Sequence, residues 1–172
     1  MDAIINYPDC FAGAFIAPIL SVRLSRSNSH ETGEHNSMSK ADRDKWNQRY
    51  AEDSYRKTNP VTLLSDWLPR IPVGRALDVA CGAGRNAIFL AEAGFEVDAI
   101  DISHEGLKQV AQEARGANLD IRCIEHDLDE PYAFARDYDL IVVLWYVNLP
   151  LITQLCDCLA AGGYLLCEEH LR

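Results

Sequence analysis

The sequence is poor in basic residues. Lys and Arg number 16 against 26 Asp and Glu, which gives a formal net charge of -10. Neither residue type forms a cluster that would make a local basic patch. Proteins that bind nucleic acids need such a patch to neutralise phosphates. The composition therefore predicts no nucleic-acid partner.

A hydrophobic run long enough to cross a membrane is also lacking. The apolar stretch at residues 10–20, CFAGAFIAPIL, has about half of the length that a spanning helix needs. The residues before it carry Asp2 and Asp9 and no Lys or Arg, the wrong charge for a secretory signal. We expect no membrane partner and a cytoplasmic protein; a transit peptide around Arg23 and Arg26 is the alternative.

The cysteines do not have the spacing of a zinc site. There are six, and the one close pair, Cys156 and Cys158, stands on a predicted helix. Two histidines, His30 and His35, lie in a polar stretch where solvated side chains are the usual outcome. We therefore predict no metal site, and small buried thiols in a reducing compartment.

The chain divides at about residue 40. Residues 1–40 end in a polar, serine-rich stretch without periodicity, which predicts a flexible or leader-like segment. Residues 41–172 form the predicted domain, which begins with an amphipathic helix at 42–57 that places Trp46 and Tyr50 on one face. Pro60 is predicted as the first residue of a second helix that extends to residue 68.

Apolar strands then alternate with helical patterns. The predicted strands are 75–80, 95–100, 119–126, 138–147 and 163–170, and the predicted helices are 86–94, 103–116 and 149–161, with a short irregular or helical link at 128–137. Ser103 is predicted to cap one helix and Gly94 to end another. This order predicts the α/β class: a doubly wound, Rossmann-like parallel sheet with helices on both faces. Ligands of such sheets bind at the carboxyl ends of the strands.

A glycine turn follows the first predicted strand. Gly82 and Gly84 stand between that strand and a helix, the context in which a Gly-x-Gly loop approaches a ligand with its backbone. Asp78 precedes the loop, and its charge would repel the pyrophosphate that such loops usually hold. It would attract an ammonium or sulfonium instead. The alternative is that Asp78 caps a loop or pairs with Arg75 or Arg85.

Two more carboxylates occupy matching positions. Asp101 ends the second strand, where an acid accepts hydrogen bonds from ribose hydroxyls. Asp127 follows the third strand, where it can accept from an adenine amino group. Taken singly, each acid has an alternative as a helix cap or a solvated loop residue. Together the three acids predict a ligand with an amino-acid cation, a ribose and an adenine, which are the parts of S-adenosylmethionine.

Five segments resemble the motifs of class I S-adenosylmethionine-dependent methyltransferases: LDVACGAGRN, VDAIDIS, CIEHDL, YDLIVVLWYV and LAAGGYLLCEE. The run GRNAIFLAEAGFEVDAID is similar to the tellurite-resistance methyltransferases and their thiopurine-methyltransferase-like relatives. The resemblance covers residues 40–172. It implies an enzyme that transfers a methyl group to a small molecule such as a thiol or a selenium or tellurium oxyanion.

The resemblance also implies roles for particular residues. Asp78, Gly82 and Gly84 would surround the methionine part of the cofactor, and Ala80 is a further cofactor-binding residue. Asp101 would bind the ribose, Trp145 would face the methyl group, and the residues near the adenine would be Ile102, Asp127 and Leu128. The segment KWNQRYAE resembles the helix that covers the cofactor, which implies that Trp46 and Tyr50 close over it. The resemblance also implies that Asn86 binds the cofactor. Asn86 and Arg85 both match the sequence pattern of the tellurite-resistance subgroup.

The pattern departs from the family after the fifth strand. The usual C-terminal antiparallel hairpin is missing, which indicates an incomplete domain or a homodimer through the open sheet edge. A non-catalytic module that binds S-adenosylmethionine and an NAD-dependent oxidoreductase are the alternative functions. The residues do not identify a general base; Tyr146, Asn148, Glu169 and His170 are the candidates.

Overall fold

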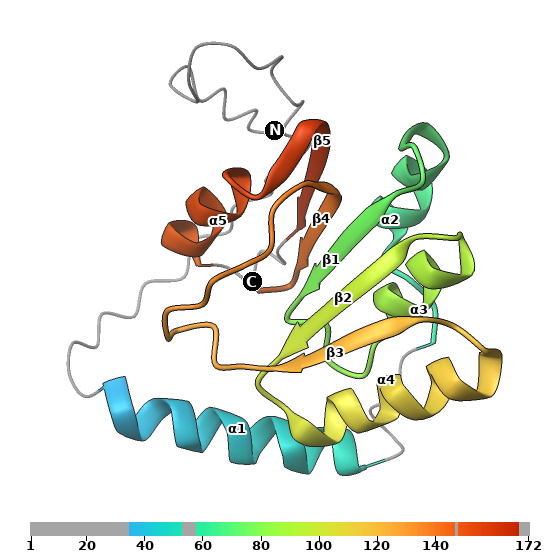
Figure 1. Cartoon of the computed structure of the whole chain (residues 1–172). Helices are drawn as coiled ribbons and strands as arrows, with labels where there is room; N and C mark the ends of the chain where they lie inside the picture. Colours follow the sequence, from blue (N-terminus) through green and yellow to red (C-terminus); the bar gives the residue numbers. More distant parts are fainter. Residues whose placement is uncertain (1–34, 53–57, 147, 169–172) are drawn as a thin grey trace.

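A five-stranded parallel sheet forms the centre of the fold (Figure 1). The computed structural model describes residues 35–52, 58–146 and 148–168. The strands, in spatial order, are β3 (Ile121–Glu125), β2 (Glu96–Asp101), β1 (Arg75–Val79), β4 (Tyr138–Leu144) and β5 (Leu159–Glu168). The strand order reverses beside β1, so the carboxyl end of this central strand is where a doubly wound sheet binds its ligand.

Helices lie on both faces of the sheet. One face packs against α2 (Thr62–Trp67), α3 (Arg85–Glu92) and α4 (His104–Ala117), and the other against α5 (Leu149–Cys156) (Figure 1). Successive side chains of a strand point to opposite faces. Two apolar clusters therefore form, one on each face of the sheet. Ala76 on β1 belongs to the first cluster, on the face of α2, α3 and α4, and Leu77 belongs to the second cluster, on the face of α5.

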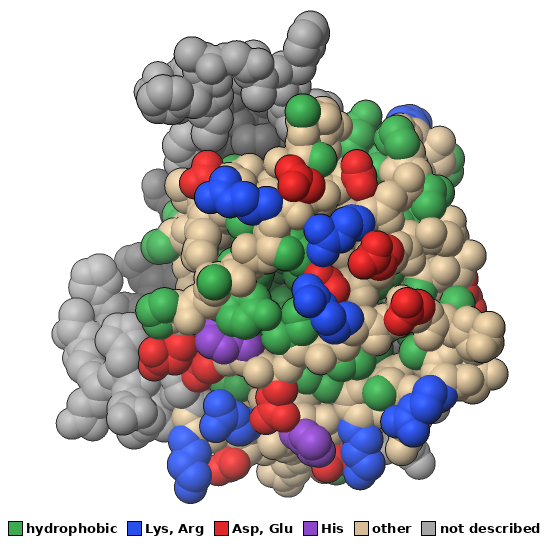
Figure 2. Space-filling model, viewed as in Figure 1, with side chains coloured by type: hydrophobic (Ala, Val, Ile, Leu, Met, Phe, Trp, Pro, Cys, Tyr) green, Lys and Arg blue, Asp and Glu red, His purple; other side chains and the backbone are tan. Residues whose placement is uncertain are grey.

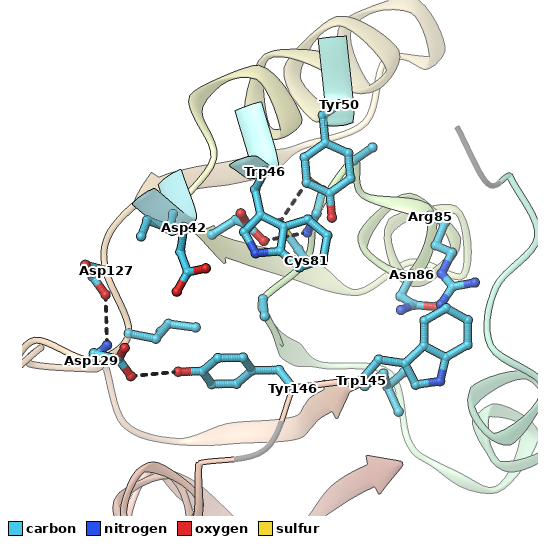
Figure 3. Close-up of a pocket in the computed structure, with 17 residues that line it drawn as sticks. Asp42, Trp46, Tyr50, Cys81, Arg85, Asn86, Asp127, Asp129, Trp145 and Tyr146 are labelled. Carbon is cyan, nitrogen blue, oxygen red and sulfur yellow. Dashed lines mark hydrogen bonds between the residues drawn. The ribbon is translucent and has the colours of Figure 1, made fainter. Parts of the chain in front are cut away.

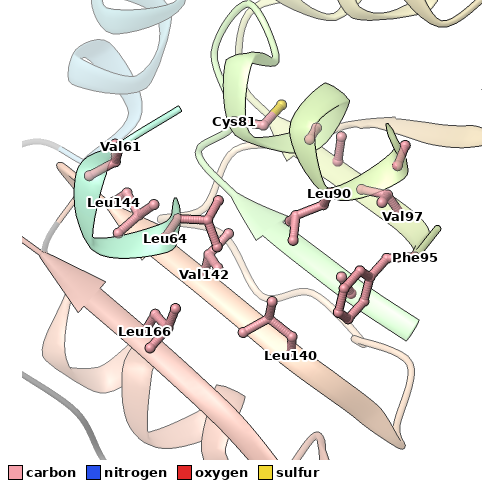
Figure 4. Packing of buried hydrophobic residues seen from close by; sticks show 14 of the residues in the cluster. Val61, Leu64, Cys81, Leu90, Phe95, Val97, Leu140, Val142, Leu144 and Leu166 are labelled. Carbon is pink, nitrogen blue, oxygen red and sulfur yellow. The ribbon is translucent and has the colours of Figure 1, made fainter. Parts of the chain in front are cut away.

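The first apolar cluster is the larger one (Figure 4). Leu64 from α2 and Leu90 from α3 meet Leu140 and Val142 from β4 there. Each of these four side chains is fully buried. Complete burial of an aliphatic side chain of this size stabilises the fold by about 1.5–3 kcal/mol. This packing fixes the sheet against α3 and thereby the position of the loop that joins β1 to α3.

The predicted fold class is confirmed. Ser103 is the N-cap of α4 and accepts a hydrogen bond from the backbone N–H of Gly106, as predicted. Gly94 follows α3 with a φ of 96°, a conformation that suits glycine. The segment between β3 and β4 forms no helix, so of the two alternatives expected there the link is irregular.

Several element boundaries differ from the predictions. The first helix, α1 (His35–Ala51), begins several residues before position 42, because the apolar periodicity marks only the part of a helix that packs. Pro60 is not helical, since the Val61 that follows is extended, with a ψ of 136°, and caps α2.

The third difference concerns the end of the chain. Residues 159–161, predicted as the end of a helix, belong to β5. The backbone N–H of Tyr138 donates to the carbonyl of Cys158, and Leu159 pairs with Tyr138, so the chain enters the sheet directly after the α5 cap. Residues 1–34, which make up most of the predicted leader segment, lie outside the described residues, as do Glu169 and His170.

Charges of both signs are mixed on the face of the molecule that Figure 2 shows. On this face, Lys and Arg side chains lie among Asp and Glu. Within the described ranges, no helix has the length and apolar character needed to cross a membrane. The absence of a nucleic-acid or membrane partner stays a prediction.

Candidate active site

A cavity of about 230 Å³ opens at the carboxyl ends of the central strands, beneath α1 (Figure 3). Its walls come from α1, the loop after β1, the ends of β2 and β4, and the turn after β3. The lining residues are Asp42, Trp46, Tyr50, Ala80, Cys81, Gly82, Ala83, Arg85, Asn86, Asp101, Ile102, Asp127, Leu128, Asp129, Leu144, Trp145 and Tyr146.

The loop between β1 and α3 is built from left-handed backbone conformations. The φ angles of Ala80, Gly82 and Gly84 are 56°, 58° and 86°. At Ala80 this conformation is strained, because a side chain rarely adopts it, and such strain concentrates at functional sites. At Gly82 a Cβ atom would collide with the hydroxyl oxygen of Tyr50. Glycine is therefore favoured there by the backbone conformation, and an added methyl group would also have to displace the Tyr50 ring of α1.

Asp101, the last residue of β2, holds this loop in place. Its Oδ2 accepts a hydrogen bond from the backbone N–H of Gly82, and its Oδ1 accepts one from the N–H of Ser103, both at 2.8 Å. Burial raises the pKa of the Asp101 carboxyl, and the two hydrogen bonds oppose that shift. A carboxylate offers about four lone-pair sites. Asp101 thus retains acceptor capacity for a ligand in the cavity that it lines.

Asp78 lies beneath the loop and not in the cavity wall. It is 1% exposed and is absent from the lining residues. Its Oδ2 has no hydrogen-bond partner. The pKa of Asp78 is raised from 3.8 to about 8, chiefly by burial and secondly by the nearby charge of Asp101. The structure thus places Asp78 behind the cavity wall with a raised pKa, and its contact with a cationic ligand stays a prediction.

One alternative for Asp78, an ion pair with Arg75, is not formed. Arg75 bonds elsewhere, with Nη2 3.7 Å from Oδ2 of Asp98 and a backbone N–H that donates to Asp139. The charge of Arg85 does act on Asp78 and lowers its pKa slightly.

The turn after β3 carries two further carboxylates. Asp127 is 9% exposed, and its Oδ1 accepts from the backbone N–H of Asp129 at 3.0 Å. The hydroxyl of Tyr146 donates to Oδ1 of Asp129 at 3.4 Å, a contact visible in Figure 3. Burial raises the pKa of Tyr146 to about 12, so this hydroxyl stays protonated at neutral pH and acts as a donor. Asn148, another predicted candidate, lies outside the cavity wall and caps α5 by accepting from the N–H of Leu151.

The helix α1 closes the cavity from above. The rings of Trp46 and Tyr50 stack with centroids 5.7 Å apart and both line the cavity. Between them, Asn47 accepts hydrogen bonds from the Ser103 hydroxyl at 2.8 Å and from the Glu105 N–H at 3.2 Å. Gln109 on α4 donates to the carbonyl of Tyr50. These contacts dock α1 on the start of α4.

The opposite end of the cavity is formed by Arg85, Asn86 and Trp145. The Arg85 guanidinium lies over the Trp145 indole, 3.9 Å from the ring centroid. The buried Asn86 accepts a hydrogen bond from the backbone N–H of Val61 at 3.0 Å and so ties the approach to α2 against α3. Trp145 has a φ of 72°, a strained value for a bulky residue.

The structure brings most of the predicted binding residues to one cavity. Ten of the twelve line it, and Asp78 and Gly84 do not. Sequence reasoning missed Asp42, Cys81, Ala83, Asp129 and Leu144 and assigned no role to Arg85. Asp42 precedes Trp46 by four residues on the same helix, and that spacing was a signal that could have identified it.

A central glycine loop, acids at the ends of β2 and β3 and a covering helix define an α/β domain of the class that binds adenosine-containing cofactors. The family model described as "Methyltransferase domain" matches residues 76–163, just over half of the chain. The chain therefore belongs to the methyltransferase-domain family.

Two relatives share sequence with the chain. The YqeM protein of Bacillus subtilis (strain 168) is 41% identical over 70 residues, which cover 41% of this chain and 28% of that protein. Hemagglutinin 1 of Eikenella corrodens is 37% identical over 124 residues, which cover 68% of this chain and 41% of that protein. The chain thus spans less than half of the length of both relatives.

Solved structures share the fold. A methyltransferase from Thiobacillus denitrificans, crystallised with S-adenosyl-L-homocysteine, has a TM-score of 0.58 and 20% identity and covers 71% of this chain and 53% of its own. Magnesium protoporphyrin IX methyltransferase from Synechocystis PCC 6803, with bound S-adenosylmethionine, has a TM-score of 0.56 and 20% identity over 74% of both chains. TehB from Haemophilus influenzae has a TM-score of 0.56 and 21% identity over 73% of this chain and 44% of its own.

Proposed function

We propose that this protein binds S-adenosylmethionine and transfers its methyl group to a small molecule. The observation that carries the proposal is that Asp101 and Asp127, from the ends of neighbouring strands, line one cavity together with the glycine loop. In this arrangement Asp101 accepts hydrogen bonds from the ribose hydroxyls, and Asp127 accepts from the adenine amino group beside Leu128.

The charge of the cavity supports the same ligand. The described lining contains four carboxylates, Asp42, Asp101, Asp127 and Asp129, and one cationic side chain, Arg85. S-adenosylmethionine carries a sulfonium and an ammonium against a single carboxylate. Its net positive charge suits such a cavity, whereas the pyrophosphate of NAD would meet repulsion. The lining therefore fits the methyl donor better than a dinucleotide.

The residues of the chain supply binding, alignment and cover. When bound, the cofactor supplies a methyl group on an activated leaving group. The task left to the protein is to align the acceptor with the methyl carbon and the sulfur, and alignment contributes about 7–11 kcal/mol in favourable cases. Trp46 and Tyr50 exclude water from above, and Trp145 forms the floor beside the methyl group.

The proposed class of methyl acceptor follows from the residues beside Trp145. Among the described lining residues, Tyr146 is a protonated donor, Asp101 and Asp127 are assigned to the cofactor, and Asp129 accepts from Tyr146, which leaves Asp42 of α1 as the acid without an assigned ligand. A soft nucleophile such as a thiol or a selenium or tellurium oxyanion needs little assistance from a base. The resemblance of residues 84–101 to the tellurite-resistance subgroup supports the same choice.

Calorimetric titration tests cofactor binding. We expect S-adenosylmethionine and S-adenosylhomocysteine to bind and NAD not to bind. Asp127→Ala is expected to weaken binding about tenfold or more, because a charge-assisted hydrogen bond contributes about 1.5–3 kcal/mol. Asp120→Ala, on an exposed residue outside the cavity wall, is the matched control. Binding of NAD in preference to both methyl-donor ligands would overturn the proposal.

A turnover assay separates the enzyme from a binding module. The protein is incubated with S-adenosylmethionine labelled in the methyl group and with small thiols, selenite or tellurite. Methylated product supports the enzyme; cofactor binding without product from any acceptor supports a non-catalytic module, a function that the partial coverage of the relatives leaves as the second candidate.

A homodimer in the cytoplasm is the proposed assembly. Among the described strands β5 pairs with β4 alone, so its other edge carries backbone groups that a second copy can pair with. Light scattering at several protein concentrations measures the mass in solution. A monomer at all concentrations would contradict the dimer.

A further inference from the structure

Asp78 is a buried carboxyl with one oxygen that lacks a partner. The residue is 1% exposed, and its Oδ2 has no hydrogen-bond partner among the described residues. Its neighbours Leu77 and Val79 belong to the second apolar cluster, so the Asp78 side chain lies on the opposite face of β1, which α2, α3 and α4 cover. The residues paired with it on β2 and β4 are the uncharged Ala99 and Val142. Buried polar atoms are nearly always paired, so this oxygen requires an explanation.

The groups that act on Asp78 come from three elements. Asp101 at the end of β2 contributes a negative charge. From α3, the backbone N–H of Ala87 donates a hydrogen bond and Arg85 contributes a positive charge. The Cys81 thiol of the loop stays neutral, because burial raises its pKa. Burial and the charge of Asp101, in that order, dominate and raise the pKa of Asp78 from 3.8 to about 8.

The two acids lie on either side of the glycine loop. Asp101 lines the cavity and accepts from the N–H of Gly82, which favours its ionised form. Asp78 precedes Ala80, a residue of the cavity wall, by two positions. Two interacting buried carboxyls do not both ionise easily, because the charge of one raises the pKa of the other. A cation within about 4–6 Å reverses this effect and lowers a carboxyl pKa by about 1–3 units.

We propose that binding of the cofactor ionises Asp78: the carboxyl holds a proton in the free protein and releases it to the solvent when the positively charged ligand occupies the cavity. This inference rests on the proposed cofactor. S-adenosylmethionine brings a sulfonium and an ammonium to the loop in front of Asp78, and the carboxylate left by the proton attracts both. Cofactor affinity is thereby coupled to pH.

The first test counts the protons released on binding. Calorimetric titrations of the wild type at about pH 6.5 are repeated in buffers that differ in their enthalpy of ionisation. The slope of the binding enthalpy against the ionisation enthalpy gives the number of protons transferred. An amino group with an ordinary pKa of about 7.7–8.0 is charged at this pH, so the ligand itself contributes little. The wild type is expected to release about 0.5–1 proton per S-adenosylmethionine.

Two controls identify the source of the proton. Methylthioadenosine shares the adenosine part of the cofactor but carries no charge, so it should bind without releasing a proton. A proton that came from Asp101 or Asp127 would appear with this ligand as well. Asp78→Asn keeps the shape of the side chain and should abolish the release with S-adenosylmethionine. Asp120→Asn, on an exposed residue, should keep the wild-type value, and circular dichroism confirms that both variants are folded.

The second test measures affinity against pH. Ligand binding that releases a proton becomes tighter as the pH rises, by up to about tenfold per pH unit. The ratio of the wild-type affinity to that of Asp78→Asn is therefore expected to rise several-fold between pH 5.5 and 8 and then to level off. The ratio removes any titration of the ligand, which both proteins share. A ratio that does not change with pH would contradict the inference.

The outcomes separate this inference from the proposed function. If the wild type binds neither S-adenosylmethionine nor S-adenosylhomocysteine, the cofactor proposal fails and this inference fails with it. If S-adenosylmethionine binds without release of a proton, the inference is wrong and the cofactor proposal stands. The same holds if methylthioadenosine, or S-adenosylmethionine with Asp78→Asn, releases as many protons as the wild type does with the cofactor.

Discussion

The Asp101 carboxylate accepts a hydrogen bond from the backbone N–H of Gly82 at 2.8 Å, across a separation of 19 residues. The end of β2 thereby fixes the loop that follows β1. The same carboxylate accepts a hydrogen bond from the backbone N–H of Ser103. It therefore links the glycine loop, the end of β2 and the start of α4 at the cavity. A residue proposed to hold a ribose is at the same time the residue that shapes the glycine loop.

This dual role predicts the effect of Asp101→Asn. The change removes the charge and turns an amide NH₂ toward one of two backbone donors, so one buried N–H loses its acceptor. We expect the free energy of unfolding to fall by about 1–3 kcal/mol and cofactor affinity to fall about tenfold or more. Chemical denaturation and calorimetry measure the two effects.

The control for that variant is Glu125→Gln. Glu125 is an exposed residue paired with His104 at 3.0 Å, and surface pairs contribute about 0–1 kcal/mol. Equal losses of stability in Asp101→Asn and Glu125→Gln would contradict the bridging role.

The buried Asp78 predicts a dependence of stability on pH. Its pKa is raised from 3.8 to about 8 in the folded state, so the folded protein keeps a proton that the unfolded chain releases. The stabilisation is fully present below pH 3.8 and is lost as the pH rises toward 8. Asp78→Asn carries a neutral side chain of the same shape and lacks this loss.

The measurement is the free energy of unfolding of the wild type and of Asp78→Asn at pH values from 5 to 9. The difference in favour of the variant is expected to grow by a few kcal/mol up to about pH 8 and then level off, since one pKa unit corresponds to about 1.4 kcal/mol. Asp120→Asn, on an exposed residue, should show no such trend. A constant difference for Asp78→Asn would show that its pKa is ordinary.

Two glycines predict opposite effects of the same substitution. Gly82→Ala places a Cβ atom against the Tyr50 hydroxyl at a φ of 58° and should destabilise the protein by at least about 1–2 kcal/mol and weaken cofactor binding. Gly116→Ala lies in α4 with nothing within 4 Å and should stabilise it by about 0.5–1 kcal/mol. Thermal unfolding measures both, and a loss of stability in Gly116→Ala would contradict the open space assigned to it.

The docking of α1 predicts a local effect of Asn47→Ala. The variant leaves the Ser103 hydroxyl and the Glu105 N–H without their acceptor from α1. Hydrogen exchange of α1 is expected to accelerate, cofactor affinity to fall several-fold, and global stability to fall by about 1 kcal/mol. Gln48→Ala, on the exposed side of the same helix, is the control. Unchanged exchange of α1 in Asn47→Ala would show that these bonds do not hold the helix.

The sequence by itself determined the architecture, because patterns that repeat along the chain are local. The alternation of apolar strands with helices, the cap at Ser103, the acid that ends β2 and the acid that follows β3 needed no tertiary information. The carboxyl ends of parallel strands lie along the same edge of the sheet, so the strand pattern also predicted where the cavity lies. Boundaries such as that of β5 were missed because Leu159 enters the sheet by pairing with Tyr138, a contact distant in sequence.

The tertiary structure alone decided the state and role of individual side chains. Asp78, expected to meet the ligand as an anion, is buried beneath the loop with a raised pKa, since burial depends on the helices packed over it. The contact of the Arg85 guanidinium with the Trp145 indole likewise exists only because the fold brings the end of β4 beside the start of α3. Charge in a sequence is a count of residues, whereas charge in a site depends on desolvation and on neighbours that the chain brings from elsewhere.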